Sequence, residues 1–383
     1  MRQIALAFAL SIFAVFVVSC GSSKKLEPPT PLEKFDKQVD TKKLWSASLP
    51  AKAKKSFARL KIEVTEEMLY AATEEGYAAA FSIEKGRKIW RINIGQRLSG
   101  GLGLGDTKVY VGSYEGELIA LDRMTGEEVW RTNVASEVLS APQESNGIVV
   151  VRTADGHLYG HRSQDGQRVW THQRQTPALI LQGGSTPVTL DDRVLSGFAS
   201  GHLDMLSITD GKLLWTVTAG VPQGRTELER IVDIDGDIVV ENDIVYVTTY
   251  QGRVSALNAE SGRPLWTRDM SSYAGITVDD RAVYISDAED KVWALDKDTG
   301  ATLWSIDNLL RRSITGPALH QEYLVVGDFD GYIHWLDKND GSFVSRRRVA
   351  SKGVLSTPVV VDEILYVFSK NGEIDAIQLE SPS

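Results

Sequence analysis

The chain repeats one short module along most of its length. Each copy has a glycine, a second glycine ten positions later and, in most copies, a tryptophan four positions after that. The complete glycine pairs are Gly76/Gly86, Gly116/Gly126, Gly156/Gly166, Gly201/Gly211, Gly252/Gly262 and Gly331/Gly341. A further copy has Asp290 and Gly300 at these positions, and the last copy has only Gly372. A period of about 40 residues built from short strands is typical of a β-propeller.

The segment 109–130 indicates how one module folds. Residues 109–112 and 117–122 are rich in β-forming residues and predict two strands joined by a turn at Gly116, which supplies the positive φ of a tight hairpin. Asp122 and Thr125 suit the next turn, because their side chains bond local backbone groups. A third strand carries Trp130, and residues such as 355–361 predict a fourth, inner strand before each copy. Such a blade cannot bury both faces alone, so blades must stack in a ring.

The tryptophan positions predict the number of blades. They are Trp45, Trp90, Trp130, Trp170, Trp215, Trp266 and Trp304, and Ser345 takes the eighth place. We therefore predict an all-β fold, an eight-bladed β-propeller of four-stranded antiparallel blades over residues 43–383. The strand around Trp45 would complete a blade whose other strands lie over 355–379. Strands from both termini then close the ring and remove its free edges, and the tryptophans pack one blade on the next.

Composition and motifs narrow the possible functions. A hydrophobic content of 42% suffices for a large core, and a net charge of −9 makes nucleic acid an improbable partner. The sequence carries no nucleophile motif, phosphate loop or metal cluster, so we predict no catalytic residue, metal or cofactor. His157 and His161 share a strand face, which favours a structural pair over a metal site. The run 346–348 of three arginines predicts a solvated outer strand.

The N-terminus predicts a lipid anchor. A short basic start precedes an apolar run over 4–18, which is short for a membrane span and ends at Val-Ser-Cys20-Gly21. This end resembles a bacterial lipobox, whose cysteine is lipidated, and Cys20 is the only cysteine. We expect a signal peptide over 1–19 and, over 20–42, a lipidated cysteine with a flexible, proline-containing tether. The alternative is an ordinary secretory signal with a chance cysteine.

Two long connections interrupt the period before Trp215 and Trp266. The first contains Leu179, Leu181 and Gln182, and the second contains Arg230, Asp233 and Asp235. Since they join neighbouring modules, we expect them to meet on one rim. Apolar side chains beside acids and arginines are typical of a protein interface, and we expect at least one leucine to be accessible and both aspartates to face a basic partner. The alternative is a pair of surface loops without a partner.

The repeat Ala-Leu-Asp-x-x-Thr-Gly-x-x-x-Trp resembles the quinoprotein-type propeller repeat. Together with the lipoprotein signal, the whole chain resembles the BamB family, lipoproteins of the β-barrel assembly machinery in the bacterial outer membrane. The resemblance implies a non-catalytic scaffold, anchored by lipid in the outer membrane and facing the periplasm, with Gly21 after the cysteine as the sorting signal. It also implies that Leu179, Leu181, Arg230, Asp233 and Asp235 bind BamA, with Gln182 where the family has arginine. Unfolded outer-membrane proteins are a further expected partner.

The alternative interpretation is an enzyme on the same ring, a dehydrogenase using pyrroloquinoline quinone and calcium, or another periplasmic propeller that binds proteins. Alcohol dehydrogenases of this class commonly hold a disulfide of adjacent cysteines against the cofactor, which one cysteine cannot form. The segment 233–237 has three acids, but its glycine falls between the second and third, unlike a calcium-binding EF-hand loop. We therefore favour the scaffold.

Overall fold

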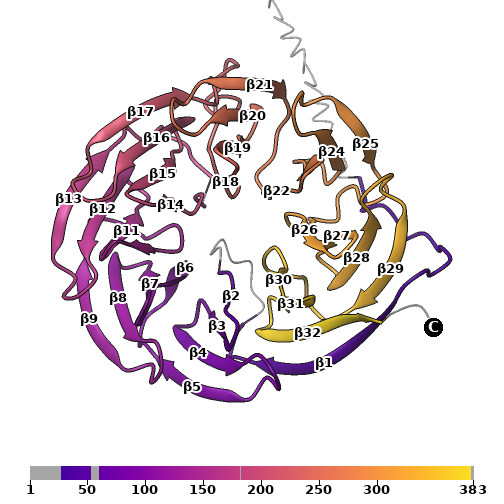
Figure 1. The fold of residues 1–383 in the computed structure, drawn as a ribbon, viewed down its shortest axis with the longest axis horizontal. Helices are drawn as coiled ribbons and strands as arrows, with labels where there is room; N and C mark the ends of the chain where they lie inside the picture. Colours follow the sequence, from indigo (N-terminus) through magenta and orange to yellow (C-terminus); the bar gives the residue numbers. More distant parts are fainter. Residues whose placement is uncertain (1–26, 53–59, 182, 381–383) are drawn as a thin grey trace, which may run out of the picture.

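The protein folds into a ring of eight antiparallel sheets with four strands each (Figure 1). The structure is a computed structural model that describes residues 27–52, 60–181 and 183–380. Within these ranges there are 32 strands, and no helix is long and apolar enough to cross a membrane. The predicted eight-bladed propeller is confirmed. The expected signal peptide and Cys20 lie outside the described residues.

Blades 1 to 4 follow the chain in order, each running from its inner to its outer strand. Blade 1 comprises β2 (Glu63–Val64), β3 (Met68–Ala72), β4 (Tyr77–Ser82) and β5 (Lys88–Asn93). Blade 2 comprises β6 (Leu98–Leu104), β7 (Lys108–Ser113), β8 (Glu117–Asp122) and β9 (Glu128–Asn133). Blade 3 comprises β10 (Gln143–Ser145), β11 (Ile148–Arg152), β12 (His157–Arg162) and β13 (Arg168–Gln173). Blade 4 comprises β14 (Val188–Leu190), β15 (Arg193–Gly197), β16 (His202–Ser207) and β17 (Leu213–Thr218).

Blades 5 to 8 continue around the ring. Blade 5 comprises β18 (Val239–Glu241), β19 (Ile244–Thr248), β20 (Arg253–Asn258) and β21 (Pro264–Asp269). Blade 6 comprises β22 (Ile276–Val278), β23 (Ala282–Ser286), β24 (Val292–Asp296) and β25 (Thr302–Ile306). Blade 7 comprises β26 (Ala318–His320), β27 (Tyr323–Gly327), β28 (Tyr332–Asp337) and β29 (Phe343–Arg348). Blade 8 comprises β30 (Val359–Val361), β31 (Ile364–Phe368), β32 (Glu373–Glu380) and β1 (Asp40–Ser48).

The repeated turn and the repeated tryptophan form one contact between successive blades. In blade 2, Asp122 Oδ1 accepts hydrogen bonds from the backbone N–H groups of Met124 and Thr125 at 2.9 and 2.8 Å, which fixes the turn. Gly126 follows with φ +76°, and a Cβ there would lie 2.6 Å from the ring of Trp90 in blade 1. The Trp90 Nε1–H donates to Arg123 O at 3.0 Å. Only glycine satisfies both the backbone conformation and the close approach of the indole.

The same contact occurs at seven of the eight blade interfaces. Each tryptophan donates its indole N–H to a backbone carbonyl of the next turn and packs on the glycine of that turn. The pairs are Trp45/Gly86, Trp90/Gly126, Trp130/Gly166, Trp170/Gly211, Trp215/Gly262, Trp266/Gly300 and Trp304/Gly341. The prediction that these tryptophans pack blade on blade is confirmed.

Strands from both ends of the chain close the ring, as predicted. β1 pairs antiparallel with β32, so that Asp40 lies opposite Glu380 and Ser48 opposite Glu373. The N-terminal strand thus becomes the outer strand of blade 8 and carries Trp45 into the seam with blade 1 (Figure 1). The strand starts at Asp40, three residues before the predicted start of the propeller.

The eighth interface, between blades 7 and 8, is built differently. In seven blades the tryptophan of the outer strand lies opposite a residue of the third strand that is alanine, glycine or methionine. In blade 7 the tryptophan lies on the third strand and the small residue on the outer strand. Trp335 on β28 lies opposite Ser345 on β29, and both are fully buried. The Trp335 indole N–H donates to His320 Nδ1 at 3.1 Å, so His320 donates its Nε2–H to Glu363 O of blade 8. Because no turn joins β32 to β1, blade 8 offers no turn glycine to an outer tryptophan.

The arginine run over 346–348 was predicted to be solvated, and this is wrong for two of its three residues. Arg346 and Arg347 are partly buried, and only Arg348 is exposed. Arg346 donates to Glu33 O at 2.8 Å and Arg347 to Thr41 O at 2.7 Å. These arginines hold the N-terminal segment: residues 27–39, part of the expected tether, lie against blades 6 and 7.

Candidate partner-binding site

The two long connections contact each other, as predicted from their places in the repeat. One connects β13 to β14 and the other connects β17 to β18, so both lead from an outer strand back to the inner strand of the next blade. The Leu181 N–H donates to Asp233 Oδ2 at 2.5 Å, and the Ser185 N–H donates to Ile234 O at 3.4 Å. The connections therefore form one element, which we call the paired loops (residues 174–181, 183–187 and 219–238).

The paired loops expose some of the predicted residues. Leu179 is 47% exposed, Leu181 is partly buried, and Arg230 is exposed at the end of a turn closed by its N–H to Glu227 O at 3.2 Å. The expectation of an accessible leucine is confirmed for Leu179. Gln182 lies outside the described residues.

The two aspartates were expected to face a partner, and the structure places them inside the protein. Asp233 and Asp235 are each 3% exposed, and Ile234 between them is fully buried. This segment enters the seam between blades 4 and 5, where a Cβ on Gly197 would lie 2.4 Å from Ile234 Cγ2. Asp233 therefore holds the paired loops together through its bond to the Leu181 N–H.

Burial changes the ionisation of the Asp233 carboxyl group, which forms this link. It raises the pKa of Asp233 to about 7, against the opposing effect of the Leu181 N–H, and the nearby Asp235 carboxylate raises it further. Oδ1 of Asp233 has no hydrogen-bond partner within the described ranges. Near neutral pH the Asp233 carboxyl group is thus divided between its protonated and ionised forms, and the link depends on pH.

Sequence reasoning missed two apolar residues of the paired loops. Leu228 is 64% exposed and Val221 is 48% exposed. Leu228 lies in an ordered turn, because Glu229 Oε2 accepts the N–H groups of Arg225 and Thr226 at 2.7 and 3.0 Å. The sequence could have indicated the exposure of Leu228, because this leucine lies between two charged residues in an insertion, where the repeat does not require burial. Leu179, Leu228 and Val221 are thus three exposed apolar side chains of the paired loops, which also carry the exposed Arg225 and Arg230.

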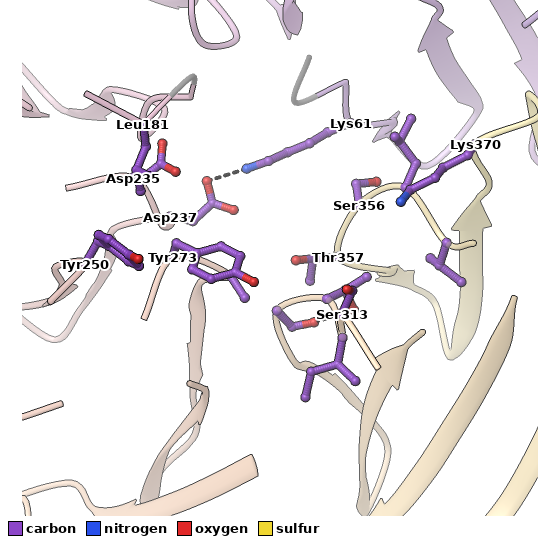
Figure 2. A pocket seen from close by; sticks show the side chains of 16 residues that line it. Lys61, Leu181, Asp235, Asp237, Tyr250, Tyr273, Ser313, Ser356, Thr357 and Lys370 are labelled. Atoms are coloured by element: carbon purple, nitrogen blue, oxygen red, sulfur yellow. Dashed lines mark hydrogen bonds and ion pairs between the residues drawn. The ribbon is translucent and has the colours of Figure 1, made fainter. Parts of the chain in front are cut away.

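A cavity of about 460 Å³ lies at the centre of the ring, beside the paired loops. Leu181 and Asp235 line one side of it, and Lys61 reaches from the blade 1 side to form an ion pair with Asp237, which precedes β18 of blade 5 (Figure 2). Blades 1 and 5 lie across the ring from each other (Figure 1). This ion pair therefore spans the central channel.

The channel residues do not fit a quinone cofactor over a calcium ion. In the ranges that the structure describes, no group of three or more His, Cys, Asp or Glu residues could hold a metal ion. The Lys61 ammonium already pairs with Asp237 in the space that a cofactor would need. His161 is buried with Nδ1 2.9 Å from Gly166 O, and His157 lies 2.9 Å from Asp155, so both histidines have structural partners.

The fold is that of the quinoprotein-type propellers. The quinohemoprotein alcohol dehydrogenase of Comamonas testosteroni has a similar structure, with a TM-score of 0.70 at 14% identity over 90% of this chain and 78% of that one. At that identity the likeness concerns the fold alone. The structure of BamB from Moraxella catarrhalis is more similar, with a TM-score of 0.82 at 28% identity over 88% of this chain and 100% of that one.

Sequence comparison identifies the family. The family model described as outer membrane protein assembly factor BamB matches residues 74–306 and 294–381. A protein of that name from Pseudomonas aeruginosa is 45% identical over 96% of this chain and 97% of its own length. One from Aliivibrio fischeri is 40% identical over 99% of this chain and 100% of its own length. The chain belongs to the BamB family, as its resemblance implied.

Proposed function

We propose that this protein is a non-catalytic scaffold of the machinery that assembles β-barrel proteins in the outer membrane. Its family membership and its full-length match to proteins named outer membrane protein assembly factor support this function. The central ion pair and the lack of metal-binding clusters among the described residues argue against the quinoprotein alternative.

The paired loops bind BamA in this proposal. One observation supports this proposal most. Leu179 and Leu228 are exposed on loops that the buried Asp233 carboxylate holds in place by its hydrogen bond from the Leu181 N–H. Exposed apolar side chains on a rigid support lose little conformational freedom on binding, which favours affinity. Arg225 and Arg230 are exposed on the second of the paired loops and suit an acidic partner surface.

The test is co-purification with BamA from membranes after replacement of Leu179 by alanine. About half of that side chain remains to be buried by a partner, so its loss should weaken binding about three- to tenfold. Leu265→Ala is the matched control, because Leu265 is 55% exposed on the outer strand of blade 5. Equal binding by both variants would place the partner site elsewhere on the ring.

Lipid attachment at Cys20 anchors the scaffold in the outer membrane, facing the periplasm. Several acyl chains on one cysteine give stable attachment. Cys20→Ser should release the protein from membranes at high salt, as measured by fractionation. Retention of the variant in the membrane fraction would contradict the anchor.

Unfolded outer-membrane proteins are a second class of partner. Seven outer strands expose an apolar side chain directly before the tryptophan, at Leu44, Ile89, Val129, Val169, Leu214, Leu265 and Leu303. In blade 7 the equivalent Val344 is buried and accepts two backbone hydrogen bonds from residues 38 and 39. A backbone carbonyl of an outer strand can thus accept hydrogen bonds from another segment of chain, and a ladder of such bonds is what β-augmentation requires. Photo-crosslinking from Val129 and Val169 to a nascent barrel protein tests this contact, and crosslinks only from the paired loops would refute it.

A further inference from the structure

Residues 27–39 are attached to the outer surface of the ring along their whole length. The Thr30 N–H donates to Leu310 O at 3.0 Å, and Arg312 donates to Thr30 O at 3.2 Å. Upstream, Arg311 donates to Pro28 O at 2.8 Å and pairs with Glu27 at 3.0 Å. The connection between blades 6 and 7 therefore holds the first described residues of the chain.

Blade 7 holds the rest of the segment. Arg346 donates to Glu33 O and lies 4.9 Å from the Phe35 ring centroid, while the Phe35 and Phe343 rings lie 5.6 Å apart. The N–H groups of residues 38 and 39 donate to Val344 O at 2.9 and 3.3 Å. Leu32 packs on the core between blades 6 and 7, and Val39 is buried between blades 7 and 8.

The arginine that clamps the segment is itself fixed from the interior. Arg346 Nε donates to His334 Nδ1 at 3.0 Å, so His334 donates its Nε2–H to Asp328 at 3.0 Å. Asp328 also pairs with Arg312 at 2.8 Å. One buried network thus connects the arginine that binds Glu33 O with the arginine that binds Thr30 O. Because of this network, the segment is an integral part of the folded propeller.

We propose that residues 27–39 act as a docked strap that holds the edge of blades 6 and 7 next to the lipid surface. This proposal rests on the proposed lipid anchor at Cys20. Glu27 lies seven positions after Cys20, which limits their separation to about 25 Å, whereas the twenty positions to Asp40 would allow about 70 Å. Blade 3 lies across the ring from blade 7 (Figure 1), so the first of the paired loops, which starts from blade 3, is held on the side away from the membrane.

The test measures energy transfer from the lipidated, full-length protein to acceptor-labelled headgroups in phosphatidylethanolamine–phosphatidylglycerol vesicles. Donors are attached at Ser342→Cys in blade 7 and Gln167→Cys in blade 3, two exposed positions that each follow a turn glycine. Transfer should be clearly stronger from position 342. Replacing Leu32 and Phe35 by serine should free the strap and remove most of this difference. Equal transfer from both positions in the parent protein, or an unchanged difference in the serine variant, would overturn the proposal.

Trypsin cleavage tests docking separately from anchoring. Lys34 and Lys37 lie on the strap, and cleavage after them should accelerate about ten- to thirtyfold in the Leu32→Ser/Phe35→Ser variant, as expected for two lost half-buried apolar contacts. The matched control is Lys37 cleavage in Asp36→Ser, because Asp36 is exposed on the same segment, and its rate should match the parent. Rapid cleavage of the parent protein would refute the docked strap. If cleavage is slow but the protein does not stay on vesicles, the anchor is wrong and the strap stands.

Discussion

The contact between turn glycine and tryptophan predicts a specific cost for adding one methyl group. Gly166 has φ +74°, and a Cβ there would lie 2.6 Å from Trp130 Cε3. Gly147 has nearly the same conformation, φ +73°, but a Cβ there would meet no atom within 4 Å. The two glycines therefore separate the cost of backbone strain from the cost of steric overlap.

Gly147→Ala should lower the free energy of unfolding by about 1 kcal/mol, the cost of a left-handed conformation for a residue with a side chain. Gly166→Ala carries the same cost and a further 1–3 kcal/mol or so, because the Trp130 ring must shift in a close-packed seam. We expect a total of about 2–4 kcal/mol. Urea denaturation followed by far-UV circular dichroism measures both values.

A double-mutant cycle between Gly166→Ala and Trp130→Ala tests the cause. Removing the ring makes room for the added methyl group, so the double variant should be about 1–3 kcal/mol more stable than the sum of the single effects predicts. Equal costs for Gly147→Ala and Gly166→Ala, together with additivity in the cycle, would refute the steric explanation of the repeat.

Three further predictions concern buried groups. The Asp233 pKa of about 7 lies above the ordinary aspartate value of 3.8, so its contribution to stability is complete below that value and is lost as the pH rises to about 7. Asp233→Asn should therefore flatten the dependence of thermal stability on pH between about pH 4 and 7, and an unchanged slope would contradict this assignment. The effect of pH on the contribution of Asp328 has the opposite sign. Burial opposes ionisation of Asp328, but hydrogen bonds from His334 and from backbone groups, together with the charge of Arg312, lower its pKa, so its contribution to stability is lost as the pH falls below about 4. Asp328→Asn should therefore reduce the loss of thermal stability in acid, as measured by melting temperature against pH. Trp335→Ala should cost about 3–5 kcal/mol in urea denaturation, because it leaves a large cavity and His320 without its indole donor, and a cost below 1 kcal/mol would show that the eighth interface does not depend on this residue.

The repeat predicted the fold because each of its elements has a local physical cause. A turn that needs positive φ requires glycine, and a seam that needs a large flat side chain favours tryptophan, so both appear in the sequence at fixed spacing. The sequence showed that Ser345 replaces the tryptophan of the eighth copy, but it did not show that Trp335 compensates for this replacement. Trp335 lies on another strand, and its relation to Ser345 depends on cross-strand register, which periodicity alone does not reveal. The arginine run was misjudged for the same reason, because its partners Glu33 and Thr41 are about 300 positions away.

The candidate site shows a second limit of sequence reasoning, which concerns burial. Asp233 and Asp235 lie in a polar insertion, and a charged residue in such a segment is normally exposed. Here the insertion descends into a seam between blades, where both carboxylates are buried and Asp233 exchanges contact with water for a hydrogen bond from a backbone N–H. The apolar Leu179 and Leu228 remain outside. This inversion, with acids buried and leucines exposed, is costly for stability alone, which supports our proposal that the paired loops bind a partner.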